Sequence, residues 1–294
     1  MKTPQQSYQQ LNDALGIEIY LKREDLHAYG SHKGRSIPHM IEYYAKKQNQ
    51  SSFVISSSGN AARAAIKYVV LHNRNNPTHI LTLEVYIGKK ISEEKRTILE
   101  AEREGDPHIT ITETERPKQE AFTKEKSGEA INLRQSTDDT ALEGYYELGK
   151  ELSHIPNLSA IFIPTSSGTT AQALGTFFEK NKLHPQIHSV QTEACHPIAA
   201  FFDTDFTKTT SSLAQAIVDN VAHRKNNVID AIQKSKGSGW VATDTEIHDA
   251  INLIKDTCSI IISPTAALSV AGLTKALKKG WKFDGPVVCL ITGM

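Results

Sequence analysis

The chain of 294 residues contains few cysteines, which mark disulfide-rich and metal-binding proteins. Its three cysteines, Cys195, Cys258 and Cys289, lie far apart and form neither a CxxC pair nor a metal-ligand spacing. This argues against a disulfide framework and against a metal site as the basis of the fold. We expect reduced thiols that serve as small core residues.

An excess of charge is also lacking. Lys plus Arg and Asp plus Glu number 33 each, and the basic residues form no dense stripe, which argues against nucleic acid or a membrane surface as the main partner. The most apolar stretch, 259–273, is too short and too interrupted to span a bilayer. The polar start MKTPQQSYQQ has no apolar signal-peptide core. We expect a cytoplasmic protein.

Short apolar, β-branched runs alternate with helical patterns along the whole chain. This alternation predicts an α/β protein with parallel sheets flanked by helices, whose ligands bind at the carboxyl ends of strands. Strands are predicted over 17–22, 52–58, 81–87, 108–112, 131–136, 160–164, 187–193 and 286–292. Helices are predicted over 36–47, 61–73, from a Ser92 cap onward, and over 117–126, 141–152, 169–181, 244–257 and 263–280.

One lysine is a candidate for covalent chemistry. Lys33 lies in GSHKGR, between the first predicted strand and the helical pattern of 36–47. A lysine whose pKa is lowered by burial or by neighbouring charge can form a Schiff base with an aldehyde cofactor. Taken by itself, the motif fits a solvated surface lysine better than a covalent one.

Two turns rich in serine and glycine each follow an apolar strand and open a helix. The first is SSSGNAA, 56–62, and the second is PTSSGTTAQALG, 164–175. Hydroxyls and the amides of a helix start can cradle a carboxylate or a phosphate. Neither turn is a GxxxxGK[ST] loop or a GxGxxG fingerprint, and either could be a plain capped turn.

The stretches KREDLHAYGSHKGR, SSSGNAA, TSSGTT, SPTAALSVAGL and LITGM, in this order, resemble the fold-type II pyridoxal-phosphate enzymes. That family includes threonine synthase, cysteine synthase, threonine dehydratase and the tryptophan synthase β chain. The resemblance runs from about Thr3 to Met294. It is strongest to threonine synthase, through GSGWVATDTEIHDAI, VVCLITG and YIGKKISEEK.

The resemblance implies pyridoxal phosphate as cofactor and assigns a role to each motif. Lys33 would carry the cofactor and move the Cα proton of the substrate, Asn60 would hydrogen-bond the pyridoxal oxygen, and Thr292 would face the pyridine nitrogen. The turn that would hold the cofactor phosphate consists of Ser166, Ser167, Gly168, Thr169 and Thr170.

Further residues would bind the amino-acid substrate. The loop that closes over the substrate carboxylate would contain Ser57, Ser58 and Gly59. Arg35 is a candidate partner for a substrate phosphate because it follows the lysine closely, although an exterior arginine explains it equally well.

The expected architecture has two domains with the cofactor in the cleft between them. The large domain would comprise 1–38 and 139–294, and a small domain of 39–138 would be inserted into it. We also expect a homodimer.

The expected reaction converts O-phosphohomoserine to threonine and phosphate. A serine/threonine ammonia-lyase, a cysteine synthase-like β-replacement enzyme and a non-catalytic relative that binds the cofactor or an amino acid stay open. Three features depart from the threonine synthase pattern, namely His32, Gly34 and a phosphate turn poor in glycine.

Overall fold

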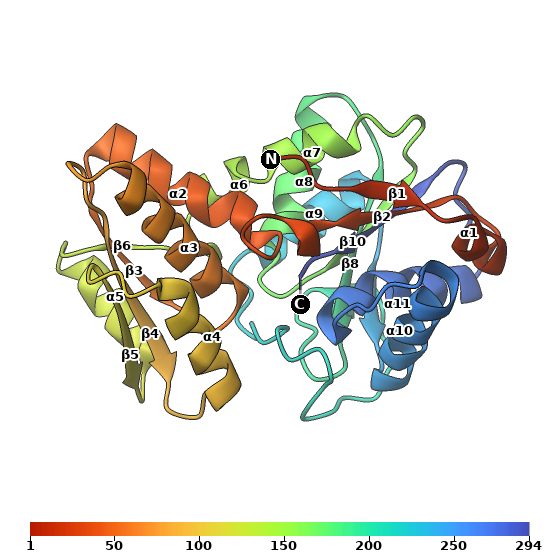
Figure 1. The fold of residues 1–294 in the computed structure, drawn as a ribbon. Helices are drawn as coiled ribbons and strands as arrows, with labels where there is room; N and C mark the ends of the chain where they lie inside the picture. Colours follow the sequence, from red (N-terminus) through yellow and green to blue (C-terminus); the bar gives the residue numbers. More distant parts are fainter. Residues whose placement is uncertain (294) are drawn as a thin grey trace. The chain divides into compact units, whose positions relative to one another are not determined.

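The computed structural model describes residues 1–293, which divide into two compact units (Figure 1). The large unit contains residues 1–27 and the chain from 145 on, and the small unit contains 28–144. Residues 28–38 and 139–144, assigned to the large domain from the sequence, cluster with the small unit instead. They do so because helix α2 (Lys33–Gln48) is continuous and packs on α3 (Asn60–Asn75) and α6 (Thr140–Glu143).

The large unit contains a six-stranded sheet in the order β1-β2-β10-β7-β8-β9, parallel except for β1. Its strands are β1 (Gln5–Ser7), β2 (Ile19–Arg23), β7 (Ala160–Pro164), β8 (Gln186–Thr192), β9 (Gly239–Ala242) and β10 (Val287–Ile291). Strands β7 and β10 are buried along their whole length, as expected for parallel strands covered on both faces.

Helices pack around this large sheet. They are α1 (Gln9–Leu15), α7 (Tyr146–Leu152), α8 (Thr169–Lys180), α9 (Lys225–Lys234), α10 (Asp244–Cys258) and α11 (Pro264–Lys278). The main apolar core takes alternate residues of β7, Ala160 and Phe162, and packs them against α10 and α11. Because strand side chains alternate, Ile161 and Ile163 face the other side of the sheet.

The small unit contains a four-stranded parallel sheet in the order β5-β4-β3-β6. Its strands are β3 (Ser52–Ser56), β4 (Thr82–Gly88), β5 (Ile109–Thr114) and β6 (Ile131–Asn132). One face packs Phe53 and Ile55 against α2, α3 and α4 (Glu93–Arg103), and the other packs Val54 against α5 (Pro117–Lys126). The small sheet is therefore also covered on both faces.

Most predicted elements are confirmed, and the errors have local causes. The helix predicted over 141–152 is wrong, since it breaks between α6 and α7. At the break, a Cβ on Gly144 would lie 2.6 Å from the Arg35 carbonyl oxygen, so α2 and this turn approach very closely. The strand predicted over 131–136 is only two residues long. Strand β9 and helix α9 were not predicted.

Two of the three cysteines, Cys195 and Cys289, are buried, Cys258 is half-buried, and all three thiols are free. Among residues 1–293, no helix combines the length and apolarity needed to cross a membrane.

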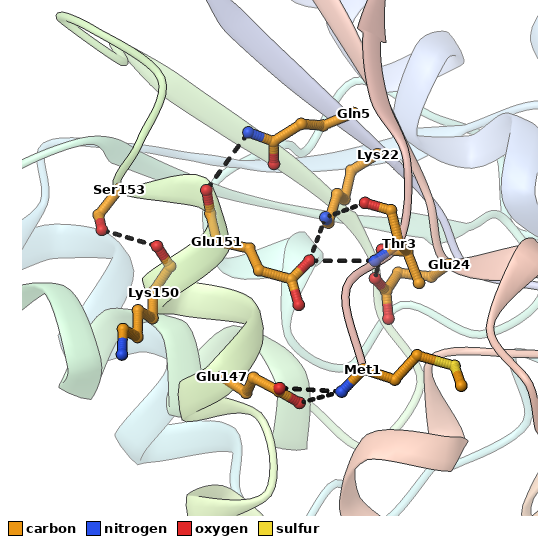
Figure 2. Close-up of polar contacts among 9 residues, drawn as sticks. All are labelled: Met1, Thr3, Gln5, Lys22, Glu24, Glu147, Lys150, Glu151 and Ser153. Carbon is orange, nitrogen blue, oxygen red and sulfur yellow. Dashed lines mark hydrogen bonds and ion pairs between the residues drawn. The ribbon is translucent and has the colours of Figure 1, made fainter.

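A buried ion pair fastens the N-terminal segment of the large unit (Figure 2). The ammonium of Lys22, on β2, is fully buried, pairs with the Glu151 carboxylate of α7 and donates to the Thr3 carbonyl at 2.8 Å. The Thr3 amide donates to the same carboxylate at 3.3 Å. This cluster joins three segments that are distant in the sequence.

We expect Lys22→Met to lower the free energy of unfolding of the large unit by about 3–5 kcal/mol, because it removes the fully buried cation that pairs with the Glu151 carboxylate. Urea denaturation followed by tryptophan fluorescence measures this, since both tryptophans, Trp240 and Trp281, lie in the large unit.

The matched control is Lys46→Met, which removes an exposed pair with Glu42 at 3.0 Å and should cost about 0.5 kcal/mol or less. The double variant Lys22→Met/Glu151→Leu should regain part of the loss. Equal effects of Lys22→Met and Lys46→Met would contradict this account of the buried pair.

Candidate active site

In the small unit, the predicted site residues gather at the carboxyl edge of the sheet. Helix α2 leads into β3, and β3 leads into α3, so both helices run antiparallel to β3 and begin at its carboxyl end. Lys33 is the first residue of α2 and Asn60 is the first residue of α3. The fold thus brings the amine and the amide to the same edge, although the sequence predicted that α2 would start later, at 36.

Lys33 is a half-buried amine. Its backbone N–H donates to the hydroxyl of the buried Ser31 at 3.3 Å, which fixes the start of α2. Burial lowers the pKa of Lys33 from 10.5 to about 8, and no carboxylate within residues 1–293 pairs with its ammonium. At pH 7 about a tenth of the amine is then neutral, against about three in ten thousand for an ordinary lysine.

The loop before α3 offers hydrogen-bond donors. The Ser57 hydroxyl accepts from the Gly59 amide at 3.3 Å, and in the described part of the chain the Ser58 hydroxyl makes no hydrogen bond. Gly59, the N-cap of α3, provides no side-chain cap, and the first turn of this helix has no acidic residue. Such a helix start attracts an anion. Arg35, in the first turn of α2, is buried, with 5% of its surface exposed.

In the large unit, the turn of 166–170 connects β7 to α8. Gly168 occupies the N-cap with a φ of 89°, and a Cβ there would lie 2.5 Å from the Val228 Cγ2 atom, so this position requires glycine. The Ser167 and Thr169 hydroxyls lie 3.0 Å apart. The first turn of α8 contains no acidic residue, and its N-terminal end is therefore suited to a phosphate.

Two further sets of hydrogen bonds hold this turn, and neither was predicted. The Ser166 hydroxyl accepts from the amides of Val218 and Asp219 at 3.2 and 3.3 Å. The side chain of Gln191, fully buried on β8, donates to the carbonyls of Thr165 and Ser166 at 3.2 and 3.5 Å.

The amide oxygen of Gln191 accepts from the backbone N–H groups of Ile198 and Ala199, both at 2.8 Å. All polar atoms of this buried side chain are therefore used, and they join the turn of 166–170 to the chain after β8. The only signal for it in the sequence was a glutamine within the predicted strand of 187–193.

Thr292 lies at the same edge of the large sheet as this turn. It directly follows β10, and its side chain is buried, with 2% exposed. In the parallel pair β10–β7, the last paired residues are Cys289 and Phe162. Thr292 and Thr165 each lie three residues beyond that pair, in the same direction. Neighbouring strands are about 4.8 Å apart, so Thr292 flanks the turn of 166–170.

Ser263, the N-cap of α11, was part of a predicted motif without a predicted role. Its hydroxyl donates to the Gly293 carbonyl at 2.6 Å and accepts from the Ala266 amide at 3.2 Å. It therefore ties the start of α11 to the residue after Thr292.

These residues fit pyridoxal phosphate. In the large unit, the start of α8 at Gly168 and its adjacent hydroxyls suit the cofactor phosphate, and Thr292 adds a neutral hydroxyl beside them. In the small unit, the desolvated amine of Lys33 suits the cofactor aldehyde.

Comparison with known proteins agrees with this fit. A family model described as "Pyridoxal-phosphate dependent enzyme" matches residues 1–293. The chain is 27% identical over 301 residues to a threonine synthase from Mycobacterium leprae, covering 99% of this chain and 80% of that protein. It is 25% identical over 307 residues to a serine racemase from Dictyostelium discoideum, covering 99% and 89%.

Among solved structures, the processed form of threonine deaminase isoform 2 from Solanum lycopersicum superposes with a TM-score of 0.78. The alignment covers 100% of this chain and 79% of that one at 18% identity. This likeness shows a shared fold, that of the two-domain fold-type II enzymes.

We expect Gln191→Leu to weaken the binding of pyridoxal phosphate about tenfold, because the turn of 166–170 loses two hydrogen bonds that position it. Titration of the apoprotein with the cofactor, followed by absorbance, measures the dissociation constant. Gln191→Glu keeps the two accepted bonds and loses the donated ones, so it should also weaken binding.

The control is Gln186→Leu, at the opposite end of β8, whose side chain contacts His188 at 3.0 Å. It should leave cofactor affinity within about twofold. Wild-type cofactor affinity in both Gln191 variants would show that this side chain does not position the turn.

Proposed function

Because the chain belongs to the family of pyridoxal-phosphate dependent enzymes and takes pyridoxal phosphate as its cofactor, we propose that it eliminates a leaving group from an amino-acid side chain, as a threonine synthase. The substrate would be O-phosphohomoserine, and the products threonine and phosphate. The observation that carries this proposal is the likeness to threonine synthase over 99% of the chain.

Lys33 is the proposed base. Its lowered pKa, about 8, leaves a useful fraction of neutral amine near neutral pH, which is what proton abstraction from the substrate Cα requires. Its position at the carboxyl edge of the small sheet is shared with Asn60, the proposed donor to the pyridoxal oxygen.

The large unit would hold the cofactor through two groups. The turn of Ser166–Thr170 binds the phosphate with backbone amides and hydroxyls at the start of α8. Thr292 offers a neutral hydroxyl to the ring nitrogen, and a neutral group cannot hold that nitrogen protonated as a carboxylate would. When bound, the cofactor supplies an electron sink for the charge that develops at Cα.

The small unit would hold the substrate. The loop of Ser57, Ser58 and Gly59, at the uncapped start of α3, binds the α-carboxylate. Arg35 is a proposed partner for the substrate phosphate. Loss of a Cβ proton would accompany cleavage of the Cγ–O bond to phosphate. Cγ would then take up a proton to become the methyl group, water would add its hydroxyl at Cβ, and a proton would return to Cα.

Other amino-acid reactions remain candidates because fold alone does not decide between them. The similarity to a serine racemase over 99% of the chain favours racemisation or deamination of serine as a second function. The histidine before Lys33 also departs from the threonine synthase pattern.

Product analysis decides between these functions. Purified protein with cofactor should convert O-phosphohomoserine to threonine and phosphate faster than it acts on L-threonine, L-serine or O-acetyl-L-serine offered in parallel. Lys33→Ala should abolish turnover, whereas Lys47→Ala, an exposed lysine on the same helix, should not affect it. If 2-oxobutyrate, pyruvate or D-serine is instead the main product, the dehydratase or racemase function replaces ours, and a lack of any product supports a binding protein.

A further inference from the structure

A cleft of about 500 Å³ opens in the small unit, beside the loop proposed to hold the substrate carboxylate. It is lined by residues 56–58 at the end of β3, 86–88 at the end of β4 and 116–119 at the start of α5. The cleft therefore lies at the carboxyl edge of this parallel sheet, where α/β proteins commonly bind ligands. No role assigned so far uses the residues of its far wall.

That far wall carries two cations without counter-ions. Arg116 and Lys118 both line the cleft and are exposed, and within residues 1–293 neither side chain pairs with a carboxylate. Three nearby carboxylates already have cations of their own, whereas Glu120, in the first turn of α5, forms no ion pair within residues 1–293. The pairs are Glu84–Lys124 at 3.3 Å, Glu113–Arg96 at 2.8 Å and Glu115–Lys89 at 2.9 Å.

The near wall supplies hydrogen-bond donors. The hydroxyl of Ser58 makes no hydrogen bond within the described residues, and the adjacent Ser57 belongs to the same loop. Helix α5 begins beside the cations without a side-chain cap, and Glu120 in its first turn offsets part of the positive end of the helix. A cleft with cations on one wall and hydroxyls on the other suits an anion.

We propose that this cleft selects substrates with an anionic side chain, a phosphate or a carboxylate. Under this proposal, Arg116 and Lys118 bind this second anion in place of Arg35, which is buried in the first turn of α2 and does not line the cleft. The inference rests on the proposed function in that the ligand is an amino acid whose α-carboxylate lies on the loop of 57–59. Because Ser57 and Ser58 belong both to that loop and to the cleft wall, one short ligand can reach both places. Neutral serine and threonine would leave the two cations without a ligand.

Three amino acids that share a three-carbon side chain test the anion requirement. They are L-2-amino-5-phosphonopentanoate, L-2-aminoadipate and L-norvaline, which end in a phosphonate, a carboxylate and no anionic group. Dissociation constants for the enzyme with cofactor are measured by calorimetry. We expect norvaline to bind at least about tenfold more weakly than the tighter-binding of the two anionic ligands. Comparison of these two with each other shows whether the cleft prefers a phosphonate or a carboxylate.

Variants locate the effect. Arg116→Gln and Lys118→Gln should each weaken the preferred anionic ligand about tenfold and change norvaline binding less than twofold. Lys126→Gln, an exposed lysine at the other end of α5, has the same change in net charge and should leave all three affinities unchanged. The proposal would be overturned if the three ligands bound equally well. It would also be overturned if Lys126→Gln weakened the anionic ligand as much as Arg116→Gln and Lys118→Gln do, or if those two variants weakened norvaline as much as the anionic ligand.

These outcomes separate the anion site from the proposed reaction. If no threonine forms while the Arg116 and Lys118 variants lose only the anionic ligands, the site stands and the reaction fails. If threonine forms while the ligands bind equally, the reaction stands and the site fails.

Discussion

Parallel strands that share a sheet end at the same edge, and the placement of every candidate group in this protein depends on that constraint. In the large unit, the pairing of β10 with β7 aligns Thr292 with the turn of Ser166–Thr170. In the small unit, β3 fixes where α2 and α3 begin, which brings Lys33 and Asn60 to one edge. Residues separated by more than a hundred positions in the large unit thereby become neighbours through strand register alone.

Buried polar contacts then hold the turns at these edges in place. Gln191 uses its whole amide to join the phosphate turn to the chain after β8, and Ser263 joins the start of α11 to Gly293. The buried pair of Lys22 and Glu151 does the same for the N-terminal segment (Figure 2). Such contacts cost desolvation when they form, and removing one partner is costly because the other stays buried.

The sequence was sufficient for the fold class, most strands and the two anion-binding turns, because apolar runs and Ser/Gly turns are local signals. It was insufficient wherever a distant contact decides the local structure. The helix break near Gly144 follows from its close approach to Arg35, and the role of Gln191 follows from carbonyls 25 or more positions away. The early start of α2 depends on Ser31 and on the packing of its first turn against α6. Likewise, the cations of the cleft stand out only once the partners of their neighbouring carboxylates are known.

The central claim is that Lys33 is a desolvated amine that carries the cofactor, and its covalent trapping across pH tests this most directly. Apoprotein is mixed with pyridoxal phosphate, the product is reduced with borohydride, and the labelled peptide is quantified by mass spectrometry. Below its pKa the amine is charged and unreactive, so the initial rate of labelling at Lys33 should rise with pH and reach half its maximum near pH 8. Labelling at another lysine, or a rise at Lys33 centred near the ordinary value of 10.5, would contradict the account.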